Sequence, residues 1–108
     1  EGFLFKHGNI VRQESSFTAK AEFLKEGVSG CSGHTHRLGM YFKTLRGGSY
    51  VWIESGCLCD LQPEYITGTA NWQQGLSMIS FKPNSKHFIA QVYPIIDYQI
   101  LFGNTIIK

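Results

Sequence analysis

The first third of the chain orders its elements in a way that restricts the fold more than any other stretch. Residues 3–6 have the apolar pattern of a short strand, residues 15–26 a helical pattern, and residues 28–32 the pattern of a second strand built from small side chains. A crossover of this length predicts two parallel strands joined by a right-handed connection. Both strands then end at the same edge of one sheet, which is where ligand sites gather in such units.

The predicted helix carries signals at both ends and along one face. Ser15 or Ser16 can cap its N-terminus, and Gly27 stands where a left-handed C-terminal residue is expected. Three apolar side chains fall at positions i, i+4 and i+7, which predicts one apolar face toward the core. They are Phe17, Ala21 and Leu24.

Histidines follow each of the two predicted strands. His7 comes directly after the first strand, and the second leads into Gly33-His34-Thr35-His36-Arg37. Because neighbouring strands lie about 4.8 Å apart, the imidazoles of His7 and His34 can reach one ion. In an extended backbone His36 would point the same way as His34, and Gly33 lets the backbone come close to a ligand. We therefore expect a metal-binding corner here.

The rest of the chain has the sequence pattern of antiparallel hairpins. Strand patterns occur in pairs separated by turn residues, and residues 60–74 have the composition of a loop. The pairs are 38–44 with 50–54, 76–81 with 87–93, and 98–102 with 105–107. The predicted fold class is α+β, a single domain over residues 1–108 with one helix and a sheet that is mostly antiparallel after the parallel unit.

Composition restricts the classes of function. An apolar content of 43% with 17% charged residues predicts a globular chain, and a net charge of +2 is too small to argue for nucleic-acid binding by electrostatics alone. No apolar run approaches the roughly 18 residues of a membrane span, and we find no signal peptide. The three cysteines are odd in number, and Cys57 and Cys59 are too close for an easy disulfide. We expect reduced thiols, mostly buried and inert, in a cytoplasmic protein.

The histidine motifs resemble the last two motifs of the calcineurin-like metallophosphoesterases. In that family a strand ending in His-Gly precedes a Gly-His-x-His corner by one helix, as residues 6–8 (Lys-His-Gly) and 32–37 (Ser-Gly-His-Thr-His-Arg) do here. A later strand of the family carries an Asn-Pro-Gly-Ser-like turn, where this chain has residues 54–58 (Glu-Ser-Gly-Cys-Leu). The stretch 52–75 is most similar to the bacteriophage and bacterial branch. The resemblance covers roughly residues 3–82.

The resemblance implies the C-terminal half of an αββα sandwich with two divalent ions, Mn, Zn or Fe. It implies that His7 and His34 bind one ion and that His36 binds the other, about 3.5–4 Å away, with a bridging hydroxide that attacks phosphorus. The implied substrate is a phosphate ester, with nucleic-acid phosphodiesters among the candidates. The family gives Arg37 no fixed role, but its planar fork suits a substrate phosphate, and a solvated charge is the alternative.

Three upstream motifs of the family are absent from the sequence. They are an Asp-x-His, a Gly-Asp that supplies a bridging carboxylate, and a Gly-Asn-His that supplies a ligand and the general acid. The chain therefore resembles the C-terminal part of such an enzyme, whose missing wall would come from an N-terminal half. Alone, we expect it to bind metal weakly and to hydrolyse phosphoesters poorly or not at all.

Two other classes of function stay open. In one, the chain is a β-rich binding or assembly module with no metal or with a structural zinc on Cys57, Cys59, His34 and His36. In the other, it forms a homo-oligomer through apolar surface that a missing half would leave exposed.

Three further ring-bearing side chains are expected to have structural positions. We expect His87 at the surface, at the end of a hairpin. Trp52 and Trp72 are predicted in the core, and a base-stacking platform is their alternative.

Overall fold

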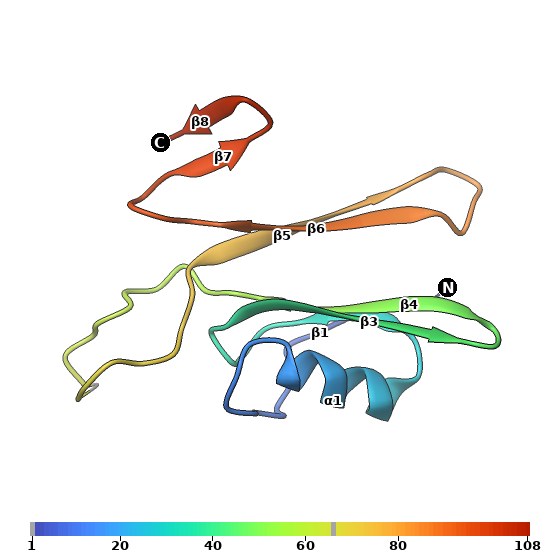
Figure 1. Ribbon diagram of the computed structural model, residues 1–108, viewed down its shortest axis with the longest axis horizontal. Helices are drawn as coiled ribbons and strands as arrows, with labels where there is room; N and C mark the ends of the chain where they lie inside the picture. Colours follow the sequence, from blue (N-terminus) through green and yellow to red (C-terminus); the bar gives the residue numbers. More distant parts are fainter. Residues whose placement is uncertain (1, 66) are drawn as a thin grey trace.

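The computed structural model describes residues 2–65 and 67–108, so Glu1 and Ile66, the latter within the predicted loop 60–74, lie outside the described residues. In chain order the elements are β1 (Phe3–Lys6), α1 (Phe17–Glu26), β2 (Ser29–Ser32), β3 (Leu38–Leu45), β4 (Gly48–Ser55), β5 (Gly75–Phe81), β6 (Phe88–Pro94), β7 (Ile100–Phe102) and β8 (Thr105–Ile107). Figure 1 shows them stacked in layers. The α+β class and every predicted strand are confirmed, with bounds that differ from the predicted ones by at most two residues.

A four-stranded sheet in the order β1-β2-β4-β3 forms the centre of the molecule. Strands β1 and β2 pair in parallel with Lys6 opposite Ser32, which confirms the predicted parallel unit. Strand β4 also runs parallel to β2, and β3 pairs antiparallel with β4 at the edge. The later strand pairs β3–β4, β5–β6 and β7–β8 are antiparallel, as predicted, and the β2–β4 pair is the parallel exception. The β3–β4 hairpin joins the sheet through its second strand, which runs in the direction of β2.

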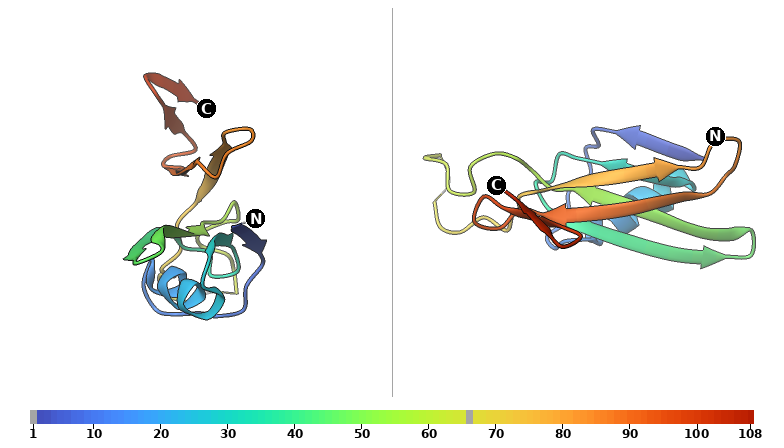
Figure 2. Two further views of the ribbon diagram at one scale, coloured as in Figure 1. Left: turned by 90° about the vertical axis from the view of Figure 1, so that its right-hand side faces the viewer. Right: turned by 90° about the horizontal axis from the view of Figure 1, so that it is seen from above.

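Different layers cover the two faces of this sheet (Figure 2). Helix α1 covers one face, where the buried residues are Ala19, Phe23 and Trp52. The β5–β6 hairpin covers the other face, where the buried residues are Cys31, Val51 and Ile53. Beyond it, the β7–β8 hairpin contacts β6 through the rings of Tyr93 and Phe102, whose centroids lie 5.3 Å apart. The order helix, sheet, hairpin therefore gives three layers around two apolar interfaces.

Helix α1 turns a different face to the sheet from the one predicted. Phe17 and Leu24 are 59% and 63% exposed, whereas Ala19, Glu22 and Phe23 are buried. Both faces carry apolar residues, so the period alone could not decide between them. The buried face is the one that fits against Trp52, which in turn fits only because its neighbour Gly30 has no side chain: a Cβ there would lie 2.4 Å from the indole.

The two ends of α1 differ in how well they were predicted. At the C-terminus Gly27 has φ 74° and its N–H donates to the Phe23 carbonyl at 2.8 Å, which confirms the left-handed cap. At the N-terminus neither serine caps the helix with its side chain. The Ser15 hydroxyl donates to the Leu38 carbonyl, and the Ser16 hydroxyl accepts from the Met40 N–H at 3.0 Å. Both hydroxyls therefore fasten the start of the helix to β3.

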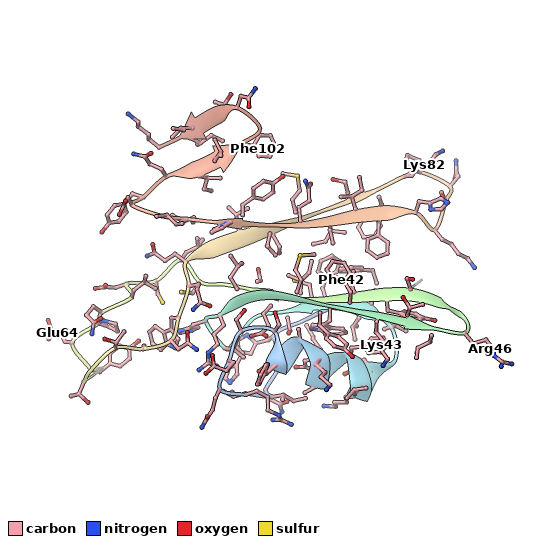
Figure 3. The ribbon with its side chains drawn as sticks, in the orientation of Figure 1. Phe42, Lys43, Arg46, Glu64, Lys82 and Phe102 are labelled. Carbon is pink, nitrogen blue, oxygen red and sulfur yellow. The ribbon has the colours of Figure 1, made fainter. Side chains whose placement is uncertain are left out.

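The two ends of the sheet carry different features. Figure 3 shows Arg46 and Lys82 at the hairpin tips at one end and Glu64 on the long loop that extends past the other end. The histidines that follow β1 and β2 lie at the loop end, because that is where parallel strands finish. Among the described elements no helix is long and apolar enough to cross a membrane.

Candidate metal centre

His7 and His34 meet where β1 and β2 end. The ladder continues one step past the strands, because the Gly33 N–H donates to the His7 carbonyl at 3.0 Å. His7 Nε2 and His34 Nδ1 lie 3.2 Å apart, with the ring centroids at 5.0 Å and the planes at 68°. Two imidazole nitrogens bound to one zinc at 2.0–2.1 Å lie about 2.9–3.4 Å apart. The spacing of this exposed pair therefore suits a shared ion, and the predicted convergence of His7 and His34 is confirmed.

The backbone between His34 and His36 is bent, whereas the predicted shared direction of the two imidazoles required an extended backbone. Both histidines adopt left-handed conformations, with φ 74° at His34 and 61° at His36. Such a conformation costs a non-glycine residue about 1–3 kcal/mol and persists only where the surroundings enforce it. Thr35, between them, is only 5% exposed. Because Thr35 points inward, the two imidazoles turn to different neighbours.

A buried carboxylate enforces this bend. Glu54, at the end of β4, has no exposed surface, and its Oε1 accepts the Thr35 hydroxyl at 2.8 Å. Its Oε2 accepts the Ala19 N–H at 3.1 Å, in the first turn of α1. A negative charge is favourable at a helix N-terminus, where N–H groups lack partners within the helix. Glu54 therefore caps the helix and holds the corner at once. Sequence reasoning missed this role, although an acidic residue ending the apolar run Tyr50–Ile53 was a signal.

The other histidine of the corner faces two cysteines. The ligand atoms of His36, Cys57 and Cys59 all lie within 4.8 Å of one another, and His36 Nδ1 is 3.8 Å from Cys59 Sγ. Cys57 is buried, which raises its thiol pKa to about 11, whereas Cys59 is exposed. The rings of Trp72 and His36 pack in a T-shaped arrangement, with centroids 4.4 Å apart and planes at 74°. Trp52 is in the core as predicted, but Trp72 was wrongly placed there and belongs to this cluster.

Backbone hydrogen bonds bring the three segments of this cluster together. The Gln73 N–H donates to the His36 carbonyl at 2.8 Å, and the Cys57 N–H donates to the Gln73 carbonyl at 3.1 Å. The Gly56 N–H donates to the Arg37 carbonyl at 2.8 Å. Gly56 has φ 79°, and a Cβ there would lie 3.2 Å from the Gln73 carbonyl oxygen, so the turn requires glycine. The cysteines thus join His36 and not His34, in contrast to the four-ligand zinc set considered above.

Arg37 is directed toward the connection before α1. Its guanidinium donates to the Arg12 carbonyl, and its Nε is buried without a partner among the described residues. The side chain therefore holds this connection against the corner, which is a structural contact that the sequence did not indicate. Its predicted contact with a substrate phosphate stays a prediction.

An ion-pair cluster fixes the end of β1 beside His7. Lys6 Nζ lies 2.9 Å from Glu22 and 2.7 Å from Glu26 on α1. The hydrogen bond to Glu26 is the main cause of a raised Lys6 pKa. Gly8 follows with φ 85°, and a Cβ there would lie 2.9 Å from Glu22 Oε2. The His-Gly pair is therefore packed closely against the helix.

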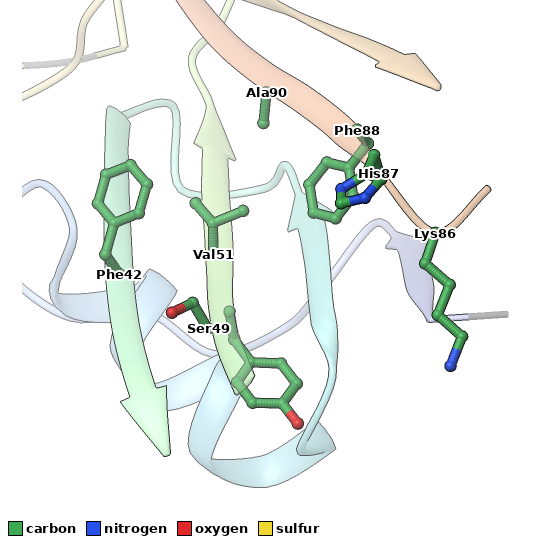
Figure 4. A pocket seen from close by; sticks show the side chains of 8 residues that line it. Phe42, Ser49, Val51, Lys86, His87, Phe88 and Ala90 are labelled. Atoms are coloured by element: carbon green, nitrogen blue, oxygen red, sulfur yellow. The ribbon is translucent and has the colours of Figure 1, made fainter. Parts of the chain in front are cut away.

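A separate cleft lies at the other end of the sheet. Figure 4 shows it between β3–β4 and the start of β6, with Phe42, Val51 and Phe88 among its walls. Its volume is about 320 Å³. His87 lines it at the hairpin end, in agreement with its predicted surface position. The cleft is remote from the other histidines, because Ser49 and Tyr50 line it at the beginning of β4 and the corner lies beyond that strand's end.

Comparison with known proteins links the chain to bacteriophages. It is 32% identical over 105 residues to the Gene 54 protein of Mycobacterium phage L5 and, to the same degree, to that of Mycobacterium phage D29. Each match covers 88% of this chain and 40% of the relative, so the chain spans about two fifths of the length of the curated relatives it matches. No protein-family model matches the chain, and no solved structure matches it.

Proposed function

We propose that the chain supplies the C-terminal histidine ligands of a two-metal phosphoesterase of the calcineurin-like type. The observation that carries the proposal is the His7–His34 pair, whose nitrogens lie 3.2 Å apart after adjacent parallel strands. The resemblance of the His-Gly and Gly-His-x-His motifs supports it, as does the order of helix, sheet and hairpin layers, which suits half of an αββα sandwich.

Each histidine of the corner has a role in this proposal. His7 and His34 would hold one divalent ion and His36 a second, with Mn, Zn or Fe as candidates. Bound ions supply a hydroxide nucleophile and neutralise charge on the phosphoryl oxygens. Thr35 and Glu54 act as positioning residues, because their hydrogen bond keeps the two imidazoles of the corner apart. The bridging carboxylate and general acid would come from an N-terminal half or from a second copy.

The substrate class in this proposal is a phosphate ester, with nucleic-acid phosphodiesters as one candidate. The phage relatives support a place of action in the cytoplasm of a bacterial or phage-infected cell. The chain's own net charge of +2 adds little attraction for a polyanion, so contacts to nucleic acid would depend on the rest of the site.

The coding sequence and one assay test the proposal. We expect the reading frame upstream of Glu1 to encode Asp-x-His, Gly-Asp and Gly-Asn-His in that order. Protein from the whole reading frame should hydrolyse a generic phosphodiester with Mn²⁺, and His34→Ala should reduce the rate by more than the roughly 10–100-fold that outer-shell changes cost. His87→Ala is the matched control and should keep full activity. A frame without these motifs, or equal rates for the two variants, would contradict the proposal.

A second candidate, an assembly module, is favoured by the exposed apolar face of α1. Phe17 and Leu24 line an open groove of about 340 Å³ on the outer side of the helix. A second copy packed there would remove this apolar surface from water. Light scattering tests this: a dimer that Leu24→Ser dissociates and Leu58→Ser does not would favour assembly, because Leu58 is also exposed but lies outside this groove. A monomer at all concentrations would exclude it.

A further inference from the structure

We propose that His36, Cys57 and Cys59 form a separate three-ligand site for a thiophilic divalent ion, with Zn²⁺ as the preferred occupant and a fourth position open to water or another ligand. This inference goes beyond the phosphoesterase proposal, because it assigns His36 to two cysteines that the resemblance leaves without a role. It takes the place of the second-ion role that the phosphoesterase proposal gives to His36. Binding of an ion at this site does not depend on phosphoester hydrolysis by the chain.

The geometry of the three side chains suits one ion. Zn–S bonds of 2.3 Å and Zn–N bonds of 2.0–2.1 Å at a tetrahedral angle separate the sulfur and nitrogen by about 3.6 Å. His36 Nδ1 and Cys59 Sγ already lie 3.8 Å apart. Within residues 2–65 and 67–108 this is the one set of His, Cys, Asp or Glu in which three ligand atoms lie within 4.8 Å of one another. Closing it around an ion requires only small side-chain movements.

The protein holds these ligands in place through its own hydrogen bonds. His36 and Cys57 are joined through Gln73, which bonds to the backbone of both. The Gln74 side chain donates to the Cys59 carbonyl at 2.8 Å, which fixes the second cysteine of the Cys-x-Cys pair. A site preformed in this way loses little conformational entropy when an ion binds.

The chemistry of the ligands selects the metal. Two thiolates and one imidazole are soft and borderline donors that favour zinc over Mg²⁺, Ca²⁺ or Mn²⁺. Two thiolates also balance the charge of a divalent ion, which matters because Cys57 is only 9% exposed. Three protein ligands leave a zinc ion with an open coordination position, as in sites where the metal also meets a substrate or water. The exposed side of Cys59 gives access to it.

The corner separates this site from the histidine pair. His34 contacts His7, whereas His36 contacts Cys59 and Trp72. The buried Thr35 lies between the two histidines and keeps them on different sides. Loss of His34 should therefore leave the cysteine site intact.

Cobalt binding to the full 108-residue chain tests the proposal directly. The chain, kept reduced and stripped with a chelator, is titrated with Co²⁺ and then with Zn²⁺. We expect one Co²⁺ per chain with thiolate-to-cobalt charge-transfer absorption, which Zn²⁺ abolishes by displacement. Cys59→Ser should weaken this binding by more than about 100-fold, beyond the usual cost of an outer-shell change. Cys59 is exposed, so the variant should fold, and circular dichroism checks that it does.

Cys31→Ser is the matched control, because Cys31 lies on β2 against Ser77 and away from the cluster. It should keep the cobalt absorption. A cobalt spectrum without charge transfer, or one that Cys59→Ser leaves unchanged, would overturn the proposal. Because the readout is absorption and not turnover, its failure is distinct from a failure of the phosphoesterase proposal.

Discussion

Replacing Thr35 with valine tests whether the inward hydroxyl of the corner holds the two histidines apart. The change keeps the side-chain shape and removes the donor to Glu54 Oε1 at 2.8 Å. Glu54 is fully buried and would keep only the Ala19 N–H at 3.1 Å, while the Arg37 N–H would lose its 3.3 Å contact to the same hydroxyl. Hydrogen bonds to charged groups contribute about 1.5–3 kcal/mol, and an unsatisfied buried charge adds to the loss.

We therefore expect Thr35→Val to reduce the free energy of unfolding by about 2–3 kcal/mol. At roughly 4–8 °C per kcal/mol for a domain near this size, the melting temperature should fall by about 10–20 °C. The assay is thermal and urea unfolding followed by circular dichroism. Loosening of the corner should also weaken metal binding by about 10–100-fold, as loss of an outer-shell partner does.

Thr44→Val is the matched control for this prediction. The Thr44 hydroxyl also makes a hydrogen bond, to Ser49 at 3.1 Å, but on an exposed hairpin. The control should change the free energy of unfolding by no more than about 0.5 kcal/mol. Equal melting temperatures for the two variants would refute the role assigned to Thr35.

Three other changes probe the core, the thiols and the ion pairs. Gly30→Ala should destabilise the chain by about 1–3 kcal/mol in urea unfolding, because its Cβ would lie 2.4 Å from the Trp52 ring. Iodoacetamide should modify the exposed Cys59 first and Cys31 only on unfolding, since burial raises the pKa of Cys31 and mass spectrometry can follow each site. A hydrogen bond from Lys6 lowers the pKa of Glu26 in the folded state. The stabilisation that Glu26 contributes is therefore present above its unfolded pKa and is lost as pH falls through its folded pKa. Glu26→Gln should flatten that part of the stability profile.

The elements could be predicted because their signals are local. Strand patterns and the glycine after α1 depend on neighbouring residues alone, and the meeting of His7 with His34 follows from the rule that parallel strands end at one edge. The position of β4 next to β2 could not be predicted in this way. It depends on long-range pairing, with Gly30 beside Trp52, that no local pattern contains.

The candidate site could be predicted only in part, because some of its features are local and others depend on long-range contacts. Residue spacing identified the histidines as candidate ligands. It did not predict the left-handed backbone at His34 and His36, because this depends on a buried carboxylate from another strand. The grouping of His36 with Cys59 depends on how residues 57–74 return to the corner. The prediction of which face of α1 packs against the sheet was wrong. Two faces of the helix carry apolar residues, and only the shape around Trp52 selects one of them.

The central claim is that one bent corner presents His34 and His36 to two different ligand sets. Cobalt absorption of His34→Ala and His36→Ala, measured on the full 108-residue chain, tests it most directly. We predict that His34→Ala keeps the thiolate-to-cobalt charge-transfer absorption. His36→Ala should weaken Co²⁺ binding at the cysteine site by more than about 100-fold. Equal loss in both variants, with both still folded by circular dichroism, would contradict the claim that the two histidines serve separate sites.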